Sequence, residues 1–182
     1  MNKDLVHIVD DDAQLRDAMV GLLQDEGFRV VAYESAERFL VAPQIVQPSC
    51  IVLDVKMDGM SGYEMQKKIA DRDFVPPIIF LTGSAPVEDA VTAMRDGAVN
   101  FLMKPTNDDK LIDAIIEAIE KSRSRAEFMA QLELLTKKER QIARLLNDGL
   151  LSKQIANELH ISVRTVEWHR QNISEKIAKT SN

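Results

Sequence analysis

Apolar runs of strand length recur along the first part of the chain, and stretches with helical spacing separate them. The runs lie at residues 5–9, 28–33, 50–54, 77–81 and 99–103. Between them, apolar positions recur every three or four residues, as at Leu15, Met19 and Leu22, which is the spacing of one face of a helix. Strands that alternate with helices in this way predict an α/β doubly wound, five-stranded parallel sheet with helices on both faces.

The helical pattern continues beyond the last strand. The segment KSRSR at residues 121–125 interrupts the apolar positions but contains neither Gly nor Pro, so we expect one long helix over residues 108–134. Three shorter helical segments follow at residues 137–147, 152–159 and 162–176, and a short turn joins the last two as in a helix-turn-helix. We therefore expect an α/β domain over residues 1–120, a linking helix over 108–134 and a small all-α domain over 135–182.

Charge is distributed unevenly between these parts. Residues 1–120 carry 11 Lys and Arg against 22 Asp and Glu, whereas residues 121–182 carry 12 against 7. The basic segment is the one expected to meet a polyanion. No apolar run approaches the roughly 20 residues that span a bilayer, and the N-terminus turns acidic where a signal peptide would be apolar. We expect a cytoplasmic protein with no membrane partner, and its single cysteine, Cys50, excludes an internal disulfide.

Carboxylates follow two of the apolar runs. Asp10, Asp11 and Asp12 come directly after the first run, and Asp54 ends the third. In an open parallel sheet both positions face the crevice outside the carboxyl ends of the strands. Carboxylates held close together repel unless something neutralises them, and Mg²⁺ prefers oxygen ligands. We therefore expect Asp10, Asp11 and Asp54 to bind Mg²⁺, and Asp12 to cap the helix that follows.

Two further strand ends supply groups that suit an anion. Thr82 offers a hydroxyl at the end of the fourth run, and Lys104 offers a positive charge after the fifth. The joint pattern VDD, LD, LTG and KP resembles the receiver domain of two-component response regulators, over residues 1 to about 120. This resemblance implies a flavodoxin-like fold and a cis peptide bond between Lys104 and Pro105.

The same resemblance implies a set of roles. Asp54 would accept a phosphoryl group from the phosphohistidine of a sensor histidine kinase, with no enzymatic turnover beyond slow loss of that group by hydrolysis. Mg²⁺ would be held by Asp10, Asp11, Asp54 and the backbone carbonyl of Lys56. Thr82 and Lys104 would contact the phosphoryl group, and Thr82 and Phe101 would form the conformational switch.

One position departs from the family pattern. The loop reads MDGMSG where the family has M-P-G-M-S-G, so Asp58 replaces a proline. The backbone φ angle there is no longer fixed by a ring. The added carboxylate either points to solvent, or enlarges the metal cluster or weakens phosphorylation. An aspartate-nucleophile hydrolase of the haloacid-dehalogenase type is disfavoured, because its acid/base aspartate would have to stand where this chain has Lys56.

The C-terminal segment over residues 134–178 resembles the LuxR-type helix-turn-helix, in the arrangement of FixJ-like transcriptional regulators. The last helix is then a recognition helix that enters the major groove of DNA. Expected phosphate contacts are Lys153, Arg164, Thr165, His169 and Arg170. Expected base contacts are Glu167, Trp168 and Gln171, although a large aromatic such as Trp168 is also typical of a packed core.

The chain ends in AKTSN, where that family begins a fourth helix that commonly forms the dimer contact. We therefore expect dimerisation to depend on the α/β domain or on the helix 108–134. Phosphorylated Asp54 would favour a homodimer that binds promoter DNA, with RNA polymerase as a further candidate partner. The alternative is a phosphorylation-independent DNA-binding protein whose α/β domain serves only for dimerisation.

Overall fold

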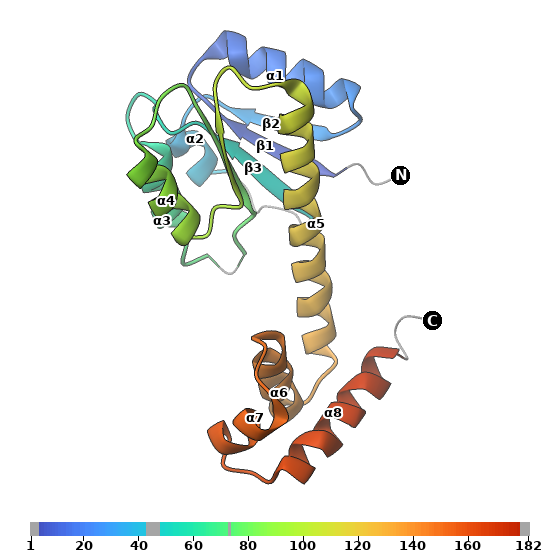
Figure 1. Ribbon diagram of the computed structural model, residues 1–182. Coiled ribbons are helices and arrows are strands. Elements are labelled where there is room, and N and C mark those ends of the chain that lie inside the picture. Colours follow the sequence, from blue (N-terminus) through green and yellow to red (C-terminus); the bar gives the residue numbers. More distant parts are fainter. Residues whose placement is uncertain (1–3, 43–47, 73, 179–182) are drawn as a thin grey trace. The chain divides into compact units, whose positions relative to one another are not determined.

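The computed structural model describes residues 4–42, 48–72 and 74–178 (Figure 1). The chain divides into two compact units, Met1–Ser124 and Arg125–Asn182. The predicted fold class is confirmed, because a five-stranded parallel sheet with flanking helices is followed by a long helix and a helical C-terminal part. The expectation about the end of the chain concerns residues 178–182, of which 179–182 lie outside the described residues.

The sheet has the strand order β2-β1-β3-β4-β5, and all neighbouring strands are parallel. Its strands are β1 (Leu5–Val9), β2 (Arg29–Tyr33), β3 (Ser49–Leu53), β4 (Ile78–Thr82) and β5 (Asn100–Met103). The three central strands are buried along their whole length, as their continuous apolar runs predict. The strand order reverses between β1 and β3, which are direct neighbours, and this is the point where open α/β sheets bind ligands.

Helices cover both faces of this sheet. They are α1 (Ala13–Asp25), α2 (Ala36–Leu40), α3 (Gly62–Ile69), α4 (Val87–Arg95) and α5 (Asp108–Glu133). Met19 and Leu23 of α1 and Ile115 and Ile119 of α5 share one apolar core with β1, β3 and β4. Residues of α2, α3 and α4 share a second core with the opposite face of the strands. The two cores give the sheet its three-layer arrangement (Figure 1).

Helix α5 passes through the polar segment KSRSR without a break. Ser122 is fully buried, and its hydroxyl oxygen accepts a hydrogen bond from the Ser49 backbone N–H at 3.1 Å. Arg123 forms an ion pair with Asp4 at 2.9 Å. The polar residues that interrupt the apolar pattern therefore attach α5 to the starts of β3 and β1.

The C-terminal unit contains α6 (Lys137–Asn147), α7 (Ser152–Glu158) and α8 (Val163–Ala178). Ile142, Ile155, Val166 and Ile173 are buried in one small core. Val163 begins α8 and is 45% exposed, so it lies outside this core. In the part of the chain that the structure describes, no helix is long and apolar enough to cross a membrane.

Candidate functional site

The carboxyl ends of β1 and β3 meet at the switch point of the sheet. Val9 lies opposite Leu53 in the ladder, and the Asp54 N–H donates to the Val9 carbonyl at 2.9 Å. Asp10 follows Val9 and Asp54 follows Leu53, so the two aspartates are held side by side at the ends of these strands. Gly62 lies so close behind Asp54 that a Cβ there would be 2.3 Å from the Asp54 carbonyl oxygen. Only glycine allows α3 to begin at this position.

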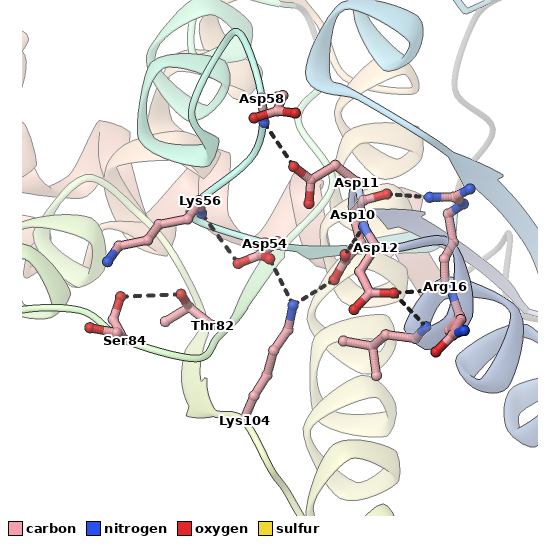
Figure 2. Close-up of polar contacts among 12 residues, drawn as sticks. Asp10, Asp11, Asp12, Arg16, Asp54, Lys56, Asp58, Thr82, Ser84 and Lys104 are labelled. Carbon is pink, nitrogen blue, oxygen red and sulfur yellow. Dashed lines mark hydrogen bonds and ion pairs between the residues drawn. The ribbon is translucent and has the colours of Figure 1, made fainter.

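Lys104 joins the two carboxylates (Figure 2). Its Nζ atom donates to Asp10 Oδ2 and to Asp54 Oδ2, both at 2.7 Å. Asp10 is 1% exposed and Asp54 is 7% exposed, so both charges are largely removed from water. The Lys104–Pro105 peptide bond is cis, as the sequence resemblance implied. Residues more than 90 positions apart in sequence thus form one contact network.

Burial and hydrogen bonding act in opposite directions on the charged groups of this network. Burial raises the pKa of the Asp10 carboxyl, and hydrogen bonds from Lys104 and the Asp12 N–H offset only part of that shift. Burial alone would lower the pKa of Lys104, but its hydrogen bonds to Asp10 and Asp54 outweigh that effect and the pKa is raised. An isolated ion pair would lower the pKa of its acid. The pKa of Asp10 is raised because the effect of burial outweighs its contact with Lys104.

The carboxylates fit a divalent cation. Asp10, Asp11 and Asp54 each offer an oxygen atom, and these oxygens lie within 4.8 Å of one another. Mg²⁺ uses such hard oxygen ligands and keeps several of its waters. Asp11 is exposed, so the cluster is open to solvent on one side. Asp12 has a different role. Its carboxylate caps α1 by accepting hydrogen bonds from the N–H groups of Gln14 and Leu15, as predicted.

The loop between β3 and α3 borders the cluster. The Lys56 N–H donates to Asp54 Oδ1 at 3.2 Å, and the Asp58 N–H donates to Asp11 Oδ2 at 2.8 Å. The Asp58 carboxylate is exposed and is not one of the clustered carboxylates. Figure 2 shows the amide nitrogen of Asp58 facing the Asp11 carboxylate.

The two predicted switch residues lie outside this network. Thr82 is fully buried, and its hydroxyl donates to the Ser84 carbonyl at 3.4 Å instead of contacting Asp54. Phe101 is half-buried and packs against Phe80, with ring centroids 5.8 Å apart. Thr82 is thus near the cluster but not bonded to it (Figure 2).

Two residues that the sequence did not single out also support the site. The Arg16 guanidinium donates to the Asp10 carbonyl at 2.7 Å. Glu37 of α2 accepts from the Met60 N–H at 3.0 Å and so holds the far end of the β3–α3 loop. Neither contact can be predicted from the neighbouring sequence, because each residue occupies an ordinary helix position.

Helix α8 carries most of the residues predicted to contact DNA. Of the predicted set, the exposed members are Lys153, Arg164, Glu167, Trp168, Arg170 and Gln171, and the half-buried ones are Thr165 and His169. Trp168 is 59% exposed, so it is not a core residue. The surface of α8 therefore presents large polar and aromatic side chains to solvent.

Several of these side chains are already engaged. Arg170 is held by the Ser152 hydroxyl of α7 at 2.8 Å and by the Glu167 carboxylate at 3.2 Å. The Thr165 N–H donates to the Ser162 hydroxyl oxygen at 3.0 Å and so helps cap the start of α8. The contact between Arg170 and Ser152 links α8 to α7, whereas the other two are local to the first half of α8.

Comparisons with known proteins agree with both units. A family model of the response regulator receiver domain matches residues 6–116, and a model of bacterial regulatory proteins of the luxR family matches residues 133–182. The transcriptional regulatory protein FixJ of Rhizobium meliloti is 38% identical over 183 residues, 97% of this chain and 90% of that protein. Nodulation protein W of Bradyrhizobium diazoefficiens is 36% identical over 186 residues, 98% of this chain and 82% of that protein.

The solved structure of full-length FixJ from B. japonicum has a TM-score of 0.63 and 37% identity, over 98% of this chain and 91% of that one. The receiver match covers the sheet and the carboxylate cluster, and the luxR match covers α6, α7 and α8. The chain therefore belongs to the response regulators that join a receiver domain to a LuxR-type DNA-binding domain and regulate transcription.

Proposed function

We propose that Asp54 accepts a phosphoryl group from a sensor histidine kinase, and that this modification controls dimerisation and promoter binding. The observation that carries the proposal is the Lys104 ammonium group, which lies 2.7 Å from both the Asp10 and the Asp54 carboxylates. A lysine aimed at a nearly buried carboxylate beside two further carboxylates suits a site where a phosphoryl group arrives.

The chemistry follows from the contacts of Asp54. Its carboxylate attacks the phosphorus of the donor phosphohistidine, a P–O bond forms, and the P–N bond breaks as the imidazole leaves and takes up a proton. Lys104 then exchanges a carboxylate oxygen for a phosphoryl oxygen. When bound by Asp10, Asp11, Asp54 and the Lys56 carbonyl, Mg²⁺ would offset negative charge on the transferring group. Slow hydrolysis of the acyl phosphate ends the signal, without turnover of a separate substrate.

Thr82 and Phe101 are the proposed switch. The long 3.4 Å contact between the Thr82 hydroxyl and the Ser84 carbonyl is easily given up when a phosphoryl oxygen offers a stronger acceptor. Movement of Thr82 would leave space beside β4 into which the half-buried Phe101 ring can turn. The face near β5 would change shape and bias the chain toward a homodimer.

We assign residues 1–120 to the phosphoacceptor domain, 108–134 to the helix that closes it and links onward, and 135–182 to the DNA-binding domain. The family matches over residues 6–116 and 133–182 support this division. The partners are then the kinase, promoter DNA and RNA polymerase at that promoter, which implies action in the cytoplasm. Lys153, Arg164, Thr165, His169 and Arg170 would contact phosphates, and Glu167, Trp168 and Gln171 would contact bases.

Phosphorylation is tested by incubating the chain with acetyl phosphate and Mg²⁺ and measuring its intact mass. The wild type is expected to gain one phosphoryl group and Asp54→Asn none. Asp12→Asn is the matched control, because asparagine also caps helices and this residue lies outside the carboxylate cluster. An unmodified wild type, or a modified Asp54→Asn variant, would contradict the assignment.

The link to DNA is tested with beryllofluoride and Mg²⁺, which mimic the phosphoryl group. Light scattering is expected to show a shift from monomer to dimer, with tighter binding to promoter DNA in a gel-shift assay. Equal affinity with and without the mimic would favour the alternative, in which the receiver serves only for dimerisation.

A further inference from the structure

Three alternate backbone amides of the β3–α3 loop donate to three carboxylates from different parts of the fold. The Lys56 N–H donates to Asp54 after β3, the Asp58 N–H to Asp11 after β1, and the Met60 N–H to Glu37 of α2. The donor–acceptor distances are 3.2, 2.8 and 3.0 Å, so the contact in the middle is the shortest. The loop is therefore fixed at three points around the metal-ligand cluster.

The middle contact depends on the departure from the family pattern. Proline has no backbone N–H, so a chain with M-P-G-M-S-G in this loop cannot make the hydrogen bond to Asp11. The Asp58 side chain has no corresponding contact, because its carboxylate makes no hydrogen bond or ion pair with any residue that the structure describes. What distinguishes this loop is thus the amide of residue 58, and not its added charge.

We propose that Asp58 is a positioning residue whose backbone N–H orients the Asp11 carboxylate for Mg²⁺, an inference that rests on the metal site of the proposed function. Asp11 is exposed, and no hydrogen bond other than this one holds its carboxylate among the described residues. The contact occupies a lone pair of Oδ2 and leaves Oδ1 for the cation. The same loop carries the Lys56 carbonyl, so one contact fixes two of the expected metal ligands relative to each other.

The amide supports metal binding and does not compete with it. A carboxylate has about four lone-pair sites, so it can accept an N–H and bind a cation at the same time. Carboxylates that bind metals are commonly hydrogen-bonded in this way, and loss of such a partner typically weakens metal affinity by about tenfold or more. We therefore expect a penalty of about tenfold when the N–H of residue 58 is removed.

The experiment compares four chains in Mg²⁺ titrations by isothermal calorimetry. Asp58→Ala and Asp58→Asn remove the carboxylate charge but keep the amide, and they are expected to bind Mg²⁺ within about twofold of the wild type in physiological salt, because the exposed charge is screened. Asp58→Pro removes the amide and is expected to bind about tenfold more weakly. Asp58→Pro that binds as tightly as Asp58→Ala, or tighter, overturns the proposal.

A second readout does not depend on the proline variant folding normally. In ¹⁵N-labelled wild-type protein, the amide proton of residue 58 is expected to resonate downfield and to move upfield in Asp11→Ala, which removes the acceptor. An amide resonance that is unchanged by Asp11→Ala overturns the hydrogen bond itself. Far-ultraviolet circular dichroism and thermal unfolding of Asp58→Pro show whether its Mg²⁺ affinity reports on the amide or on lost structure, and in the latter case the amide resonance decides.

Absence of a metal site and absence of a role for the residue 58 amide give different experimental results. A wild-type chain that binds no Mg²⁺ at millimolar concentration contradicts the metal site of the proposed function. A wild type that binds Mg²⁺ while all three Asp58 variants bind equally well contradicts only the role of the residue 58 amide.

Discussion

Replacing Glu139 by glutamine is expected to destabilise the C-terminal unit at neutral pH by about 1–2 kcal/mol. One oxygen of this carboxylate, Oε2, accepts from the Thr136 N–H and the Thr136 hydroxyl, both at 2.8 Å, and from Lys176 Nζ at 2.6 Å. The first two contacts cap the start of α6, and the third attaches the last turn of α8. Glu139 is only 4% exposed, so water replaces none of these donors easily.

The size of this expected destabilisation follows from the pKa of Glu139. The Lys176 ammonium and the Thr136 donors lower this pKa from 4.5 to about 2. A shift of this size corresponds to at most about 3.4 kcal/mol, at 1.36 kcal/mol per pKa unit. Lys176 is 39% exposed and solvent screens its charge, which reduces the expected contribution to about 1–2 kcal/mol. Glutamine keeps an oxygen for the helix cap but loses the charge that faces Lys176.

The sign of the pH dependence is set by the lowered pKa. Stability from the Glu139 charge is complete above pH 4.5, where the unfolded chain is also ionised, and it is lost as the pH falls toward 2. The wild type should therefore lose this increment between pH 4.5 and 2, whereas Glu139→Gln has no such increment to lose. The difference in unfolding free energy between the two chains should shrink toward zero in acid.

Urea unfolding followed by tryptophan fluorescence measures this difference. Trp168 is the single tryptophan of the chain and lies on α8, so its signal reports on the C-terminal unit. Glu167→Gln is the matched control, because its ion pair with Arg170 is about half exposed and should contribute less than about 0.5 kcal/mol. Equal stability of wild type and Glu139→Gln at pH 7, or a difference that stays constant down to pH 3, would refute the reasoning.

Three further changes have expected outcomes. Gly62→Ala should destabilise the receiver by about 1–3 kcal/mol in thermal unfolding, because the new Cβ meets the Asp54 carbonyl. In the control Gly21→Ala the new Cβ meets no atom within 4 Å, so this variant should be neutral or stabilising, and similar effects of the two variants would contradict the close approach. Ser122→Ala should lower the free energy of unfolding in urea by about 1–3 kcal/mol, because it leaves the buried Ser49 N–H unpaired. The control Ser124→Ala changes an exposed residue and should leave the free energy of unfolding almost unchanged, and equal losses in the two variants would count against the contact. Arg164→Ala should weaken binding to duplex DNA and flatten the dependence of log affinity on log salt by about one unit, and an unchanged slope would exclude a phosphate contact at Arg164.

The order of strands and helices was determined by the sequence itself, because burial of strands and of helix faces imposes regular spacing on apolar residues. The same is true of local caps. Asp12 was predicted to cap α1, and its carboxylate lies within three residues of the amides that it contacts. The strand ends could also be grouped in advance, since the carboxyl ends of parallel strands lie at one edge of a sheet. From that rule alone, Asp10, Asp54 and Lys104 are expected to lie together.

Other features were decided only by the tertiary structure. Ser122 interrupts the apolar pattern of α5 yet is fully buried, because a backbone amide 73 residues away needs an acceptor. The exposure of Trp168 is likewise set by the packing of α8 on its neighbours and not by its residue type. For Asp58 the sequence raised only the question of an added carboxylate, whereas the fold places the backbone amide against Asp11, 47 residues earlier. Periodicity reports which side of an element is buried, but the partner of a single polar group depends on distances between elements that no local pattern contains.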